Sequence, residues 1–408
     1  MTTAVWIAGI GMTPFGRHSG KSVGELTRWA VTDALRDCGA DLGALDAAFF
    51  GTATQGALEG QHMISGQIAL RAMGIQRIPV VNVENACATG ASAFALAVNQ
   101  VRASAADVAL AVGVERMNVG DPERTMSVFD SAYDVSDPEA LTRSLLNLGG
   151  EVDEPGLGRR SIFMDIYAAV ARNHMRLYGT TQEQIAAVAA KNHDHASTNP
   201  RAHYRKSMTV AEVLAARRLS YPLTVPMCAP ITDGAAAVVV CSEAGLRRIG
   251  AAKQVQVLAT VIGTGSDRDT STFDEHLTRA VSGRAYEQAG IGPDDVDVAE
   301  VHDATAFAEI MQTEMLGLVP LGEGGPAALR GETTCGGRIP VNPSGGLESK
   351  GHPIGASGLG QIFELTEQLR GTAGPRQIAH ARIALAENGG GFHRGEEAVA
   401  AVTVLGKV

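Results

Sequence analysis

The sequence is poor in aromatic residues and in cysteine, and it lacks any long apolar run. Aromatics make up only 4% of the 408 residues, and the five cysteines form no C-x-x-C pair. Few, unevenly spaced cysteines in an odd number argue against a disulfide framework or a zinc motif. They indicate a reducing compartment, which we expect to be the cytoplasm. Because no run of about twenty uninterrupted apolar residues occurs, we expect no membrane span.

An excess of basic residues is also missing. The net charge of −10 argues against nucleic acid as the main partner, although a phosphorylated ligand needs only a few local arginines or lysines. The remaining composition, 45% apolar and 19% charged, is ordinary for a globular protein. The chain is long enough for two domains.

Strand and helix patterns alternate from the N-terminus onward. Residues 4–10 have no basic leader and indicate a strand rather than a signal peptide. Ser22 and Glu25 have the spacing of a capping box and Gly39 is a typical stop, so we expect a helix between them. The alternation continues with strands at 47–50, 80–83 and 108–114 and helices at 63–73 and 88–102. This order predicts a parallel or mixed sheet covered by helices on both faces.

A second alternating unit follows later in the chain. Residues 231–240 form an apolar strand that closes the first unit. The second unit has expected strands at 255–262, 296–301, 378–385 and 398–404, and expected helices at 273–288, from 304, and at 354–369. We therefore expect two halves of similar architecture, residues 1–117 with 221–250 and residues 251–408, although no strong repeat of residues is visible.

The segment between the two parts of the first half, residues 118–220, has a different pattern. Pro122, Pro138 and Pro155 interrupt an irregular run, which is followed by two amphipathic helices at about 163–178 and 181–195 and a basic tract at 199–206. We expect an inserted loop domain that forms a lid or a substrate-binding layer, because long ordered insertions are often functional.

One cysteine lies where an apolar strand passes into an apolar helix. Asn85 is a candidate cap, which places Cys87 in the first turn of the helix. Free N–H groups and the positive end of the helix dipole favour a thiolate there. Small residues on both sides of Cys87 let other segments approach the sulfur. The alternative is a buried cysteine that acts as a small apolar residue.

Three other stretches place reactive residues at strand ends or in glycine-rich turns. His302 follows a strand, His352 lies between glycines before a helix, and Glu387 precedes the glycines that include Gly389 and Gly390. Taken alone, each histidine has an ordinary structural alternative. Together, the four stretches supply one thiol, two imidazoles and one carboxylate. A cysteine nucleophile needs a base and a second group that moves a proton.

These stretches, in this order, resemble the thiolase superfamily over essentially the whole chain. The matching motifs are Asn85–Gly90, Asp233–Ala237 and Gly351–Gly358. The His302-Asp303 pair and the tract at 199–202 point to the sterol carrier protein-type branch. The resemblance implies a five-layer αβαβα fold of two duplicated halves, a homodimer, and acyl transfer with coenzyme A as co-substrate and no bound cofactor or metal.

The resemblance also implies roles for single residues. Cys87 carries the acyl group as a thioester, His352 takes its proton, and His302 binds a water or the thioester oxygen. The Cys87 N–H and the loop with Gly389 and Gly390 form a second oxyanion hole, whose fixed donors lower the barrier by a few kcal/mol each. Typical thiolases have a second cysteine where this chain has Glu387. We therefore expect either proton transfer by Glu387 or an altered step.

The substrate is less well defined by the sequence. We expect Ser344, Arg201 and Arg205 to bind substrate, and Lys206, Arg217 and Arg218 are further basic candidates for the phosphates of coenzyme A or for an acidic acyl group. Three functions follow: a thiolase acting on fatty acyl, steroid side-chain or aromatic (benzoylsuccinyl-type) CoA esters; a retro-aldolase acting on a CoA thioester; or a scaffold. Members of the branch often pair with a small zinc-ribbon/OB-fold protein, which is a candidate partner.

Overall fold

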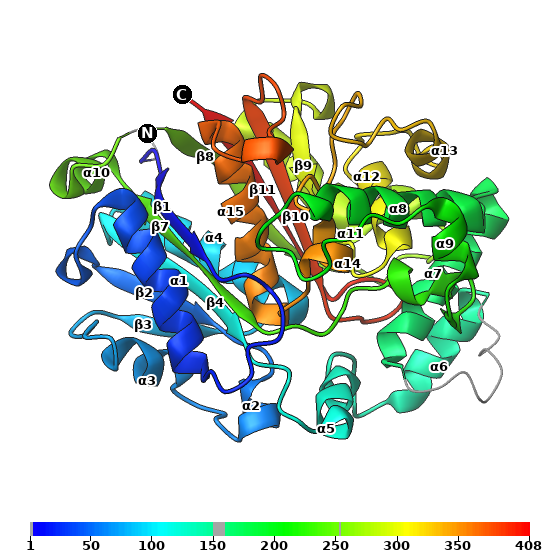
Figure 1. The fold of residues 1–408 in the computed structure, drawn as a ribbon, viewed down its shortest axis with the longest axis horizontal. Coiled ribbons are helices and arrows are strands. Elements are labelled where there is room, and N and C mark those ends of the chain that lie inside the picture. Colours follow the sequence, from blue (N-terminus) through cyan, green and yellow to red (C-terminus); the bar gives the residue numbers. More distant parts are fainter. Residues whose placement is uncertain (1–2, 150–159, 253) are drawn as a thin grey trace.

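The fold is described from a computed structural model that covers residues 3–149, 160–252 and 254–408 (Figure 1). A large mixed sheet has the strand order β3-β2-β4-β7-β1-β8-β11-β10-β9. Its strands are β1 (Trp6–Met12), β2 (Ala47–Gly51), β3 (Val80–Val83), β4 (Val108–Glu115), β7 (Gly234–Cys241), β8 (Val255–Thr264), β9 (Val298–Glu300), β10 (Ile383–Gly390) and β11 (Val399–Lys407). Each expected strand is present, although β10 begins five residues later than predicted and continues through Gly389 and Gly390.

The sheet consists of two halves with the same arrangement. In one half β2 is parallel to β4, which is antiparallel to β7, which is antiparallel to β1. In the other, β9, β10, β11 and β8 repeat this pattern of directions. The halves meet at β1 and β8 through two residue pairs, Trp6 with Gln256 and Ile7 with Val255. The counterpart of β3 is a single parallel bridge between Ala299 and Val341. The duplication is thus clear in the pairing, although the residues show no strong repeat.

Two central helices lie between the halves. They are α4 (Thr89–Arg102) and α15 (Ser357–Arg370); both follow a three-residue 3₁₀ turn, both contact strands of each half, and they contact each other. Helices α1 (Val23–Cys38) and α3 (Ser65–Arg71) cover one outer face, and α11 (Leu277–Ala289) and α12 (Ala306–Met315) lie at the other (Figure 1). This arrangement is the expected five-layer αβαβα fold.

Local sequence signals explain several helix ends. Ser22 and Glu25 form the predicted capping box of α1, and Gly39 ends the helix in the left-handed conformation. Pro122 and Pro138 were expected to interrupt an irregular segment, but they begin α5 (Pro122–Ser127) and α6 (Pro138–Asn147). Proline suits the first helical position, where no N–H is needed.

The segment 118–220 also contains α7 (Ile162–Tyr178), α8 (Gln182–Ser197) and α9 (Val210–Ala215). Residues 150–159, with Pro155, lie outside the described residues. Helix α8 packs on α12, α13 (Gly324–Leu329) and α14 (Gly346–Lys350), all from the second half of the chain. The proposed division at 118 and 220 stays a prediction. Within the described ranges, no helix is both long and apolar enough to span a bilayer.

Bare glycines bring the starts of α4 and α15 together. A Cβ on Gly113 would lie 2.1 Å from the carbonyl oxygen of Gly355, and one on Gly90 would lie 2.7 Å from the same atom. A Cβ on Gly358 would lie 2.6 Å from the backbone nitrogen of Ala91. Only glycine permits this approach without a backbone shift. The residues just before the two helices, Cys87 and His352, are therefore held near each other.

Candidate active site

Cys87 lies in the 3₁₀ turn η2 (Ala86–Ala88), directly before α4. The turn begins with Ala86 in the left-handed region, at a φ of 47°. The sequence indicates Asn85 as a cap, but its side chain does not cap the turn. Its Nδ2 donates to Ser92 Oγ, and its backbone N–H donates to Thr89 Oγ1. The predicted cap was wrong because the Asn85 side chain bonds instead to Ser92, seven positions further along the chain.

His352 precedes the 3₁₀ turn η7 (Ile354–Ala356) and α15. Its Nδ1 lies 2.7 Å from Ser357 Oγ, and this hydroxyl donates to the Pro353 carbonyl at 3.0 Å. Because the single hydroxyl proton is committed to Pro353, Ser357 accepts from His352 Nδ1–H. The Nε2 atom then carries the lone pair and is the basic nitrogen.

His302 follows β9 in the second half of the chain, and its side chain lies beside those of Cys87 and His352. Its backbone N–H donates to Glu387 Oε2 at 3.0 Å. Both ring nitrogens are buried, and neither has a hydrogen-bond partner within the described residues. Buried polar atoms normally have partners, so an unpartnered imidazole indicates a position kept for a ligand.

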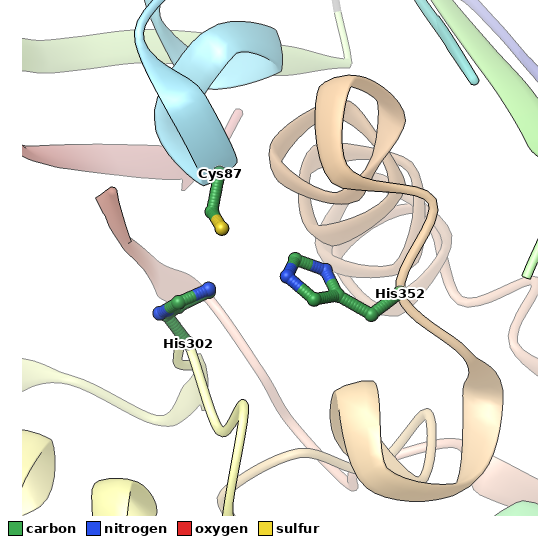
Figure 2. Close-up of side chains that lie close together, drawn as sticks. All are labelled: Cys87, His302 and His352. Carbon is green, nitrogen blue, oxygen red and sulfur yellow. The ribbon is translucent and has the colours of Figure 1, made fainter. Parts of the chain in front are cut away.

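One ligand-forming atom from each of Cys87, His302 and His352 lies within 4.8 Å of the other two (Figure 2). The imidazole rings of His302 and His352 are edge to face, with centroids 5.3 Å apart. We call these three residues the Cys–His–His triad. All three line a cavity of about 690 Å³. The structure thus brings together the thiol and both imidazoles that the sequence predicts.

Burial sets the protonation states of the triad. It raises the pKa of Cys87 to about 12, against a smaller opposing effect of a backbone hydrogen bond from Gly391. It lowers the pKa of His302 to about 4 and that of His352 well below its usual value. The free protein therefore holds a neutral thiol beside neutral imidazoles. The expected resting thiolate was wrong, because removal from water outweighs the field of the helix start.

Aromatic and methionine side chains form much of the cavity wall. Three of the ten phenylalanines and three of the six tyrosines in the chain line it. These are Phe129, Tyr133, Phe163, Tyr167, Tyr204 and Phe392, with Met117, Met126 and Met164 beside them. Phe163 lies between Phe129 and Tyr167, with ring centroids 6.3 and 6.5 Å away. One third of the aromatic residues of the chain thus line this one cavity.

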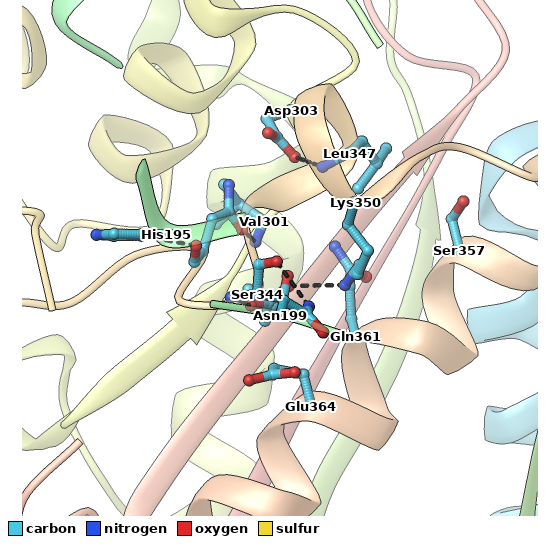
Figure 3. Close-up of polar contacts among 12 residues, drawn as sticks. His195, Asn199, Val301, Asp303, Ser344, Leu347, Lys350, Ser357, Gln361 and Glu364 are labelled. Carbon is cyan, nitrogen blue, oxygen red and sulfur yellow. Dashed lines mark hydrogen bonds and ion pairs between the residues drawn. The ribbon is translucent and has the colours of Figure 1, made fainter. Parts of the chain in front are cut away.

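A buried polar network lies behind the triad. It comprises Lys191, Asn192, Asp303, Glu309, Asn342 and Glu348. Asn192 Nδ2 lies 2.9–3.1 Å from carboxylate oxygens of Asp303, Glu309 and Glu348, and Lys191 pairs with Glu309. Asp303, next to His302 in the sequence, accepts the Leu347 N–H at 2.7 Å (Figure 3). Adjacent residues thus face different surroundings.

Several predicted site residues lie away from the cavity. Ser344 is buried (Figure 3). Its hydroxyl donates to Glu300 Oε2 at 2.7 Å. Arg201 donates to the Met12 carbonyl and lies over the ring of Phe363, and Arg205 is exposed. None of the three lines the cavity. We therefore drop them as substrate ligands, since local polar and apolar partners account for Ser344 and Arg201.

Glu387 and Gly389 also lie behind the cavity wall rather than in it. Burial raises the pKa of Glu387 to about 8, so the carboxyl is largely protonated at neutral pH. It contacts the backbone of His302 rather than the cavity, which argues against the expected direct proton transfer to substrate. A Cβ on Gly390 would lie 3.1 Å from the Cys87 nitrogen, so Gly390 lies against the nucleophile turn as predicted.

Three contributors to the site were not predicted from the sequence. Gly391 directs its N–H at Cys87, Ser357 orients His352, and Tyr167 extends the aromatic wall. Ser357 stands within the matched motif, so its position was a signal. The other two depend on segments that meet only in the folded chain. Arg217, one of the basic candidates, does line the cavity.

The chain also matches known proteins over most of its length. The family model "Thiolase, N-terminal domain" matches residues 5–216, and "Thiolase C-terminal domain-like" matches residues 262–407. An acetyl-CoA acetyltransferase of Methanothermobacter thermautotrophicus is 37% identical over 95% of this chain and 96% of its own. The benzoylsuccinyl-CoA thiolase subunit BbsB of Thauera aromatica is 35% identical over 95% and 94%. Sterol carrier protein 2 of Gallus gallus is 36% identical over 95% and 70%.

Two solved structures share the fold. The Ltp2-ChsH2(DUF35) aldolase superposes with a TM-score of 0.80 at 24% identity, covering 100% of this chain and 98% of the other. Human mitochondrial 3-ketoacyl-CoA thiolase superposes with a TM-score of 0.74 at 16% identity, covering 100% and 99%.

Proposed function

Because the chain belongs to the thiolase family, we propose that it is a CoA-dependent acyltransferase that cleaves or forms a 3-oxoacyl-CoA through a thioester on Cys87. The observation that carries the proposal is the Cys–His–His triad, whose reactive atoms lie within 4.8 Å of one another on one cavity. A nucleophile beside a base is the arrangement that covalent acyl transfer requires.

The proposed cleavage starts from a neutral pair. His352 Nε2 takes the thiol proton as the Cys87 sulfur attacks the 3-oxo carbon. The bond between carbons 2 and 3 then breaks, and its electron pair passes to the enolate of the CoA thioester. The proton held by His352 converts this enolate to the released acyl-CoA, which carries carbons 1 and 2. The thiol of coenzyme A finally attacks the enzyme thioester and gives its proton to His352, which passes it to the Cys87 sulfur as that sulfur leaves.

Two groups of donors are available for the oxygens that gain charge in these steps. His302 is a neutral imidazole with a free N–H. The backbone N–H groups of Gly391 and Cys87 act on the Cys87 sulfur. Fixed donors of this kind are worth about 3 kcal/mol each in acyl transfer. His352 remains in the correct tautomer because Ser357 holds its Nδ1–H.

For the acyl group we propose a bulky apolar or ring-bearing fragment. The support is the aromatic and methionine lining of the cavity, since ring faces attract other rings and methionine adapts to irregular shapes. Steroid side-chain and aromatic CoA esters fit this lining better than short acyl chains. Arg217 is the cavity-lining candidate for a phosphate of coenzyme A.

We also propose a homodimer in a reducing compartment such as the cytoplasm. Strand β3 is at the edge of the sheet, and Val81, Met63, Ile64 and Ile68 are exposed near this edge. Exposed strand edges and apolar patches favour pairing with a second copy. All five cysteines are free, in keeping with reducing surroundings.

A retro-aldolase that cleaves a CoA thioester without an acyl-enzyme is the second candidate. The observation that favours it is Glu387, which stands in place of a second cysteine and does not line the cavity. A small zinc-ribbon/OB-fold partner is proposed for this activity, and the aldolase with the same fold is named as an assembly with a DUF35 protein. A pure scaffold would not need the triad.

Mass spectrometry of the intact chain after incubation with acyl-CoA esters separates these functions. If the thiolase proposal is right, we expect one acyl adduct, which is absent in Cys87→Ala. The adduct is retained in the control variant Cys228→Ala, because Cys228 is a second cysteine that lines the same cavity. Full turnover by Cys87→Ala without free coenzyme A would replace the thiolase proposal with the aldolase one. No adduct and no turnover with any ester, with or without the partner, would leave the scaffold.

A further inference from the structure

The triad has the composition of a metal-ligand set as well as that of a catalytic site. We propose that Cys87, His302 and His352 bind a thiophilic divalent cation of the zinc class, which blocks the nucleophile. The site itself stands on geometry, whereas its consequence, reversible inhibition, rests on the proposed function. The sequence contains no recognisable motif for this site, because the three residues lie 215 and 50 positions apart.

The distances allow this with small movements. In a tetrahedral site with bonds of about 2.0–2.3 Å, donor atoms lie about 3.5 Å from one another. The three donor atoms here lie within 4.8 Å of one another. Closing the set therefore requires side-chain movements of about 1 Å. Both imidazoles and the thiol project into the same space (Figure 2).

Each of the two histidines has a ring nitrogen available to a metal. His302 is 98% buried, and both of its ring nitrogens lack a partner among the described residues, so one is free to bind. His352 donates Nδ1–H to Ser357, which leaves Nε2 for a metal. Ligating histidines usually donate their second N–H in this way. The unpartnered His302 is an observation independent of the cluster itself.

Ligand type decides which ions bind. One thiolate and two imidazoles suit zinc and related ions, whereas Mg²⁺ and Ca²⁺ prefer oxygen. Binding replaces the thiol proton, which passes to solvent, and forms one sulfur–metal bond. With three protein ligands, the fourth position opens into the cavity. The same sulfur cannot then attack a carbonyl, so metal and acyl group exclude each other.

Cobalt provides the test because Co²⁺ reports its ligands by absorption. We expect metal-free protein to bind one equivalent of Co²⁺ and to show a thiolate-to-cobalt charge-transfer band in the near ultraviolet, which Zn²⁺ displaces and 1 mM Mg²⁺ does not. Cys87→Ser abolishes the band. His302→Ala weakens Co²⁺ binding tenfold or more. Cys335→Ser is the matched control, because Cys335 is a partly buried cysteine outside the triad, and it leaves the band unchanged.

A second measurement protects the test against misfolded variants. In the wild-type protein, Zn²⁺ should prevent alkylation of Cys87 by iodoacetamide, read by peptide mass. Prior acylation of Cys87 should prevent the cobalt band. A band that survives in Cys87→Ser, or alkylation indifferent to Zn²⁺, overturns the metal site. An acyl adduct formed without metal tests the proposed function separately, so either idea can fail alone.

Discussion

His302 and His195 are both buried, and burial lowers the pKa of each to about 4, yet they lie in different surroundings. His195 in α8 donates Nδ1–H to the Asn342 carbonyl at 2.9 Å and accepts the Cys335 N–H at 3.2 Å. His302 has no ring partner within the described residues. The first imidazole is satisfied by the fold. The second is left for something that the fold does not contain.

The same contrast extends to the regions around the two histidines. In the buried polar network, Lys191 and Asn192 of α8 donate to the Val341 carbonyl and to Asp303, which follows β9. Asn342 donates to Glu309 of α12. In the cavity, by contrast, the side chains of the triad make few hydrogen bonds to the rest of the described chain. We therefore expect substitutions in the network to act on stability, and substitutions in the triad to act on rate. The following predictions test this division.

The largest effect is expected from removing the base of the triad. His352→Gln should lower kcat by about 10²–10⁴-fold, since positioned acid–base groups contribute that much. The free energy of unfolding should change by less than about 1 kcal/mol, because the glutamine amide can still donate to Ser357. Steady-state kinetics and urea unfolding measure the two quantities. A large loss of stability with little loss of rate would break the division.

Breaking the central charge pair of the network should have the opposite outcome. Lys191→Met leaves Glu309 buried without its cation, which costs about 3–5 kcal/mol of stability. The rate per folded molecule should change little. The matched control is Arg143→Met, which removes an exposed ion pair with Asp137 and should cost less than about 1 kcal/mol. Equal costs for both variants, measured by urea unfolding, would contradict the role of the network.

His195 should make stability depend on pH. Burial and the nearby Lys191 keep its folded-state pKa near 4, below its ordinary value of 6.5, with Asp194 opposing this. The unfolded chain therefore binds a proton first as the pH falls. The stability due to neutral His195 is present above pH 6.5 and is lost between about 6.5 and 4, at about 1.4 kcal/mol per pH unit.

His195→Gln removes the imidazole that takes up this proton in the unfolded chain. Urea unfolding between pH 4.5 and 7.5 should show a slope that is shallower than in the wild type by about 1.4 kcal/mol per pH unit. The other histidines titrate equally in both proteins and cancel in the difference. Parallel curves for the two proteins would mean that His195 is not held neutral by the fold.

These regions also differ in how far the sequence predicts them. The order of strands and helices follows from periodicity and from local signals such as Ser22 with Glu25, and both were confirmed. The motifs around Cys87, His302 and His352 indicated three groups that the structure brings together. Their catalytic roles stay a prediction.

The partners of buried polar groups could not be predicted in the same way. Ser344 bonds to Glu300, and Arg201 to the Met12 carbonyl, across 44 and 189 positions of sequence. A serine or arginine in a loop has the same local signal whether it faces a ligand or a distant carbonyl. The protonation state of Cys87 was predicted wrongly for a related reason. Burial raises the pKa of this thiol, and burial depends on every segment that covers it.

The smallest effect is expected at Ser357, which holds the ring of His352. This hydroxyl is buried in the start of α15 and accepts from His352 Nδ1–H. Ser357→Ala removes the acceptor, so His352 can change tautomer and turn its lone pair away from Cys87. We expect kcat to fall about tenfold, the worth of one hydrogen bond of about 1.4 kcal/mol.

Thr366→Val is the matched control for Ser357→Ala. Thr366 lies in the same helix and donates to the carbonyl four residues earlier, as Ser357 does, but its hydroxyl bonds to no histidine in the part of the chain that the structure describes. Both variants should lose similar stability, and only Ser357→Ala should lose rate and shift the pH profile of kcat. If both variants lost rate equally, the hydroxyl would be a helix contact and no more. If only Ser357→Ala slowed the reaction, the Ser357 hydroxyl would be shown to keep the lone pair of His352 on Nε2, where it faces Cys87.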